Sequence, residues 1–110
     1  MVLTRSFDEL VQKRAANDFA FAEAVLGEGV NALLAGEVDV GTSLLRDYIT
    51  ATVGFERLGE ATGAEAESLV RLFGSGGSLQ ARSLFRVIGY LQRQAGVALH
   101  VTVGPGYEPA

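Results

Sequence analysis

The chain has 110 residues, which is enough for one hydrophobic core and too few for two. Hydrophobic residues make up 48% and charged residues 20%, as in ordinary globular proteins. No apolar run approaches the roughly 18–20 residues of a membrane span, and the first residues show no secretory signal. Without cysteine the chain has neither disulfides nor thiolate metal sites. We therefore expect a cytoplasmic protein that binds no membrane, metal or cofactor.

Charge is distributed unevenly along the chain, whose formal net charge is −4. Residues 1–67 hold twelve acidic and five basic residues, a balance of −7, and residues 68–110 hold one acid and four arginines, a balance of +3. An acidic surface suits a basic protein partner, and an arginine cluster suits phosphates. An ordinary solvated surface is the alternative interpretation.

Three helices are predicted in residues 1–53, which we call the helical front. Along each of them apolar residues recur at spacings of three and four. Polar residues able to cap a helix start, and a glycine able to end one, mark the predicted boundaries. These are the Ser6–Glu9 capping box before a helix over residues 7–16, Asn17 and Asp18 before the second helix, Gly36 after it, and Asp39 before the third.

Three more helices are predicted in residues 54–96. Two are short, and helices of that length are marginal in water, so they must pack against their neighbours. The third is long and amphipathic. In order, the segments are a helix over 54–63, a helix over 64–73, a glycine-rich loop over 74–77, and a helix from the Ser78 cap to Gly96.

Residues 97–103 alternate between apolar and polar side chains, a period that is typical of a β-strand. The apolar side consists of Val97, Leu99, Val101 and Val103. A single strand leaves its backbone groups unpaired, so we expect it to pair with its copy across a two-fold axis and form a homodimer. Docking of the strand on its own N-terminal helices is the alternative. Residues 104–110 are predicted to be a loose tail.

The two short helices meet the demands of a DNA-binding helix-turn-helix over about twenty residues. Such a motif needs an apolar anchor, a small residue where the helices approach, a glycine at the turn, and two further anchors. In order these are Leu58, Gly59, Gly63, Leu69 and Leu72. The fold class predicted is all-α: a single compact domain of about six helices, with a helix-turn-helix and one short C-terminal strand. A purely structural helical hairpin is the alternative.

Four segments within residues 54–103 carry a family resemblance: FERLGEATG, ESLVRLFGSGG, LFRVIGYL and GVALHV. They resemble the addiction-module antidote proteins, which are Xre-like helix-turn-helix antitoxins of bacterial toxin–antitoxin operons. The resemblance implies a dimeric regulator that represses its own operon through a double-stranded DNA operator. It also implies a partner, a small basic RNase-like toxin protein encoded beside it.

The candidate DNA-binding residues follow from this placement, although Ala64 stands where such families often have a capping Ser or Thr. Arg71 is the candidate for base contact and Arg82 for phosphate contact, with surface solvation as the alternative for each. The acidic candidates either accept a hydrogen bond from cytosine or stabilise the positive end of a solvated helix. The full set is Glu65, Glu67, Ser68, Arg71 and Arg82.

No side-chain pattern indicates catalysis, so we expect no enzyme activity. His100 is the only histidine and has no cysteine to complete a zinc site, so a structural role is expected. The phenylalanines are interpreted as core residues: Phe7, Phe19, Phe21, Phe55, Phe73 and Phe85. Two functions remain, a DNA-binding regulator and a protein-interaction module that has the helix-turn-helix shape without DNA contact.

Overall fold

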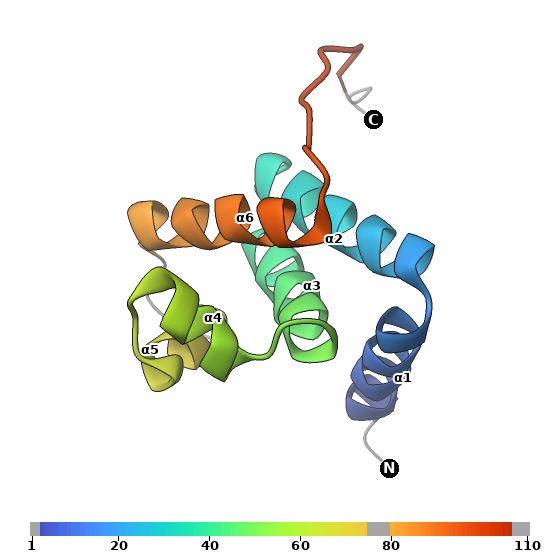
Figure 1. Cartoon of the computed structure of the whole chain (residues 1–110). Helices are drawn as coiled ribbons and strands as arrows, with labels where there is room; N and C mark the ends of the chain where they lie inside the picture. The colour runs from blue at the N-terminus through green and yellow to red at the C-terminus, as the bar shows by residue number, and fades with distance from the viewer. Residues whose placement is uncertain (1–2, 75–79, 107–110) are drawn as a thin grey trace.

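The structure is a computed structural model that describes residues 3–74 and 80–106. This part of the chain contains six helices and no strand, so the all-helical fold class is confirmed. None of these helices combines the length and the apolar character that crossing a membrane would require. The helices, arranged as in Figure 1, are α1 (Leu3–Asn17), α2 (Phe19–Leu34), α3 (Val38–Ala51), α4 (Phe55–Thr62), α5 (Ala66–Leu72) and α6 (Ala81–Ala95).

The predicted helix boundaries at Asp18, Gly36 and Gly96 are correct in the structure. Asp18 is the N-cap of α2, where its Oδ1 accepts a hydrogen bond from the backbone N–H of Phe21 at 3.1 Å. Gly36 follows α2 in a turn of positive φ. At the end of α6, Gly96 is the C-cap in the left-handed conformation.

Two other predicted helix starts are wrong. The helix α1 begins at Leu3, so the Ser6–Glu9 pattern lies inside it. The helix extends past Ser6 toward the N-terminus because none of the preceding residues is a helix breaker. The helix α3 begins at Val38, which puts Asp39 in its first turn. Backbone bonds from Gly36 and Glu37 close the end of α2, and α3 therefore starts immediately afterwards. The Ser78 cap and residues 75–77 of the glycine-rich loop lie outside the described residues.

One apolar core connects the helical front to the second half of the chain. All three helices of the front contribute to it, α1 through Val11 and Ala15, and so do all three helices of the second half. Full burial of a large apolar side chain stabilises a fold by roughly 1.5–3 kcal/mol. The apolar side chains with no more than 1% exposure are Leu26, Leu45, Ile49, Leu58, Phe73, Val87 and Leu91.

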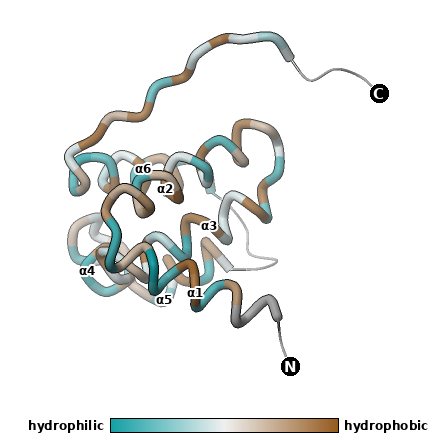
Figure 2. The backbone as a smooth tube through the Cα atoms, turned by 90° about the vertical axis from the view of Figure 1, so that its right-hand side faces the viewer, coloured by the Kyte–Doolittle hydropathy of each residue, from teal (hydrophilic) through white to brown (hydrophobic). Residues whose placement is uncertain are grey.

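The predicted C-terminal strand is not present. After α6, residues 97–106, which we call the C-terminal arm, form no strand and extend away from the helices (Figures 1 and 2). A strand needs a neighbour to complete its backbone hydrogen bonds, and the described part of this single chain offers only helices. Val101 is 73% and Val103 98% exposed, so the outer arm does not dock on the N-terminal helices either.

The interpretation of all six phenylalanines as core is wrong for three of them. Phe73 is fully buried, whereas Phe7, Phe19 and Phe85 are each more than 60% exposed. Phe85 follows Leu84 on α6 and lies beside the face that the helix buries. Phe19 has the spacing of the buried α2 residues, but as the first residue of that helix it lies beyond the edge of the core.

Candidate functional site

The helices α4 and α5 are joined by the three residues 63–65. Gly63 ends α4 with a φ of +75°, a left-handed conformation that favours glycine. The backbone N–H groups of Gly63 and Ala64 both donate to the carbonyl oxygen of Gly59, at 2.8 and 3.1 Å. These bonds satisfy one of the free carbonyls at the end of α4 and fix the direction in which the chain enters α5.

Gly59 lies where the turn passes closest to α4. A Cβ atom at this position would stand 2.6 Å from the carbonyl oxygen of Ala64, which is backbone and has little freedom to move. Only glycine therefore fits this crossing without a shift of the turn. Below it, the anchors of the two helices are buried in the core; they are Leu58, Leu69 and Leu72.

The opposite surface of α5 carries four of the five predicted DNA-binding residues. Glu65 is the N-cap of α5 and Glu67 lies in its first turn, both with exposed side chains. Ser68 and Arg71 are also exposed, and the Arg71 Nη2 atom lies 3.4 Å from the Ser68 hydroxyl. The structure thus places these residues together on one short solvent-facing helix.

Arg82, the fifth predicted residue, is exposed in the first turn of α6. The helix α6 packs on α4, and its N-terminal end lies on the same side of the molecule as α4 and α5 in Figure 1. Sequence analysis missed two exposed residues on the same helices as the predicted site, Arg86 on α6 and Val70 on α5. Arg86 is exposed one turn after Arg82, and the spacing of four residues indicates a shared helix face. Val70 is 46% exposed on α5.

The predicted dimerisation residues do not form one continuous face. Val97 and Leu99 are half-buried against the protein's own core, whereas Val101 and Val103 project into solvent. The Leu99 backbone N–H donates to the side-chain Oε1 of Gln92 at 2.8 Å, which ties the base of the arm to α6. Sequence analysis missed Gln92 because a glutamine on a polar helix face carries no signal of this contact.

A buried carboxylate lies in the helical front. Asp47 of α3 is 1% exposed, and its Oδ1 accepts a hydrogen bond from the Nε2 of Gln12 on α1 at 2.8 Å. Burial raises the pKa of Asp47, the neighbouring Asp8 raises it further, and the bond from Gln12 opposes the shift. Asp8 in turn lies 3.9 Å from the guanidinium of Arg46. This group of side chains connects α1 to α3.

In comparisons with known proteins, no family model, no curated protein and no solved structure matches the chain.

Proposed function

We propose that the protein is a sequence-specific DNA-binding transcriptional regulator, with α4 and α5 as its helix-turn-helix. The observation that carries the proposal is the close approach at Gly59, with the left-handed turn at Gly63 beside it. A helix-turn-helix needs this tight crossing so that one face of the second helix packs inward while the other reaches the major groove. The exposed Ser68 and Arg71 supply hydrogen-bond donors on that outer face.

The proposal extends to a homodimer that acts as the antitoxin of a toxin–antitoxin pair and represses its own operon. The resemblance of residues 54–103 to antidote proteins supports this role. The exposed valines of the C-terminal arm support a dimer, because unpaired backbone beside apolar side chains favours pairing with a second copy. The balance of −7 over residues 1–67 supports a basic toxin as partner, since opposite potentials steer association.

A second candidate function is a protein-interaction module that does not bind DNA. Two exposed glutamates at the N-terminal end of α5 favour it, because Glu65 and Glu67 would face the phosphates of a bound duplex. Their other role is structural, since acidic side chains stabilise the positive end of a helix dipole.

Binding to DNA from the protein's own promoter tests the proposal, measured by fluorescence anisotropy at about 50 and 200 mM salt. We expect a palindromic site whose half-sites are about ten base pairs apart.

Arg71→Ala should cost about 1–3 kcal/mol of binding free energy and relax the preference at one position of each half-site. Arg82→Ala should weaken binding to all sequences alike and flatten the salt dependence. Arg93→Ala is the matched control, because Arg93 is exposed in the last turn of α6, at the opposite end from Arg82.

The same titration separates the two candidate functions through Glu65→Ala and Glu67→Ala. If these side chains read cytosine, their removal lowers specificity for the promoter. If they only repel phosphate, their removal tightens binding to every duplex. Absence of binding at low salt, both by the protein alone and by its complex with the product of the neighbouring gene, would leave the interaction module as the function.

A further inference from the structure

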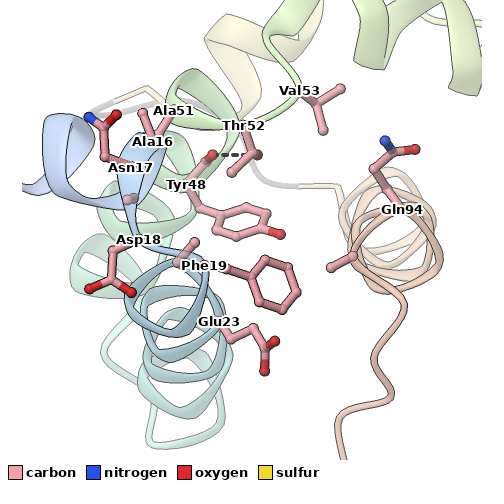
Figure 3. A pocket seen from close by; sticks show the side chains of 13 residues that line it. Ala16, Asn17, Asp18, Phe19, Glu23, Tyr48, Ala51, Thr52, Val53 and Gln94 are labelled. Atoms are coloured by element: carbon pink, nitrogen blue, oxygen red, sulfur yellow. Dashed lines mark hydrogen bonds between the residues drawn. The ribbon is translucent and has the colours of Figure 1, made fainter.

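A cavity of about 460 Å³ opens between the α1–α2 corner and the C-terminal ends of α3 and α6 (Figure 3). It lies at the seam between the helical front and the half of the chain that carries α4 and α5. Residues from both sides line it, among them Val53 just after α3 and Gln94 on α6. A group bound here would therefore touch both halves of the molecule at once.

Among the small side chains of the lining, two aromatic rings and a carboxylate project into the cavity. Figure 3 shows the rings of Phe19 and Tyr48 and the carboxylate of Glu23 projecting from α2 and α3 toward α6. Phe19 is 64% exposed and Glu23 is half-buried. The Asp18 carboxylate projects to the other side, where it caps α2. No lysine or arginine is among the lining residues, and the ion pairs within the described ranges do not involve Glu23.

The neighbouring face of the same corner already holds a guanidinium between an aromatic ring and a carboxylate. There the Arg14 guanidinium stacks over the ring of Phe21, with its carbon 4.4 Å from the ring centroid. Its Nε lies 3.9 Å from the Asp18 carboxylate. A guanidinium combines a flat face for an aromatic ring with donors for a carboxylate, a combination that the compact ammonium of lysine lacks.

We propose that this cavity binds the guanidinium group of an arginine side chain presented by a basic protein partner. Phe19 stacks on the flat face of the guanidinium and Glu23 accepts its N–H groups, while Gln94 contacts it from α6. The identity of the partner rests on the proposed function, in which the partner is a basic toxin. The preference for a guanidinium group rests on the residues that line the cavity.

A titration of the ¹⁵N-labelled full chain with N-acetyl-arginine amide tests the lining. We expect saturable shifts of the Val53 and Gln94 backbone amide signals. N-acetyl-citrulline amide has nearly the same shape without the charge and should bind at least roughly tenfold more weakly, since charge-assisted hydrogen bonds are about twice as strong as neutral ones. Equal shifts with the two probes, or shifts spread over the whole surface, would overturn the proposal.

Variants identify the residues responsible. Glu23→Gln should weaken binding of the arginine probe by roughly tenfold, because it removes the charge that the guanidinium meets. Phe19→Leu should weaken it severalfold, because it removes the ring but keeps an apolar side chain. Glu28→Gln is the matched control, an exposed glutamate on the same helix, and should leave binding unchanged. Thermal melts check that each variant is folded. Equal effects of Glu23→Gln and Glu28→Gln would mean that the probe responds only to the overall negative charge of the protein, which would refute the site.

Co-purification with the product of the neighbouring gene tests the partner separately. Glu23→Gln should reduce recovery of the complex and Glu28→Gln should not. A complex that forms equally well with both variants would refute the cavity as the docking site while leaving the proposed function intact. If the cavity binds the arginine probe but the protein binds neither DNA nor the product of the neighbouring gene, the proposed function is refuted and the site remains.

Discussion

Asp47 connects two helices through one buried side chain. Its carboxylate on α3 accepts a hydrogen bond from Gln12 on α1, close to the Asp8–Arg46 pair. Burial raises its pKa, which means that the folded state binds a proton more readily than the unfolded chain does. The contribution of Asp47 to stability is therefore greatest below the ordinary carboxyl pKa and is lost as the pH rises through the raised value.

Asp47→Asn keeps an oxygen for Gln12 and removes the buried charge. We expect the variant to unfold at higher urea concentration than the wild type at neutral pH. The difference should shrink as the pH falls through the raised pKa of Asp47 and vanish below about 4, where the wild-type carboxyl is protonated in both states. Asp39→Asn is the control, since it removes an exposed charge from the first turn of α3 and should cost ~0.3–1 kcal/mol. A less stable Asp47→Asn at neutral pH would mean that the charge itself stabilises the fold.

At the scale of elements, α4 and α5 depend on their contact with each other and with the core. An isolated helix of eight or seven residues does not persist in water, so their positions come from packing. The rings of Phe55 and Phe73 pack against each other, with centroids 6.2 Å apart, and connect the start of α4 to the end of α5. The crossing at Gly59 then determines how the outer face of α5 is presented.

The same substitution at two helical glycines tests this crossing. Gly59→Ala should lower the free energy of unfolding by about 1–3 kcal/mol, because its Cβ would meet the Ala64 carbonyl oxygen and displace the turn. Gly27→Ala in α2 should raise it by about 0.5–1 kcal/mol, because nothing lies within 4 Å of the added Cβ and alanine favours a helix. Urea unfolding followed by circular dichroism measures both. Equal effects of the two changes would show that the crossing is not tight.

At the scale of the whole molecule, the C-terminal arm is the segment whose outer backbone groups and valines lack partners within the described part of one chain. Its base is fastened by the Gln92–Leu99 hydrogen bond and by the half-buried Val97, whereas its outer part has no contact with the core. A symmetric antiparallel pairing of two arms would satisfy the backbone of both chains and cover their valines.

We expect the intact protein to be a dimer by light scattering at tens of micromolar. A chain ending at Leu99 keeps the fastened base and loses the outer arm, so it should be a folded monomer. Thr102→Pro removes one backbone donor and should weaken the dimer, whereas Thr102→Val keeps the donor and should not. A monomeric intact protein, or a dimer that survives truncation after Leu99, would rule out pairing through the arm.

The sequence by itself determined the helical class, the approximate number of helices in the described residues and most of their ends. Apolar spacing reports which face a helix buries, and residues such as Asp18 and Gly63 act locally, so both signals can be read without the fold. The same holds for the anchors of the α4–α5 pair. Local signals failed at Ser6 and Asp39, because a pattern that can cap a helix does not oblige the helix to start there.

Only the tertiary structure decided features that depend on distant partners. Residues 97–103 have the period of a strand, but a strand exists only where another backbone pairs with it, and the described part of one chain offers none. Spacing could not show that Phe19 lies beyond the core or that Glu23 and Gln94 line one cavity, because the cavity exists only where the α1–α2 corner meets the ends of α3 and α6. Burial of Asp47 likewise follows from where α1 lies on α3, a contact between residues 35 positions apart.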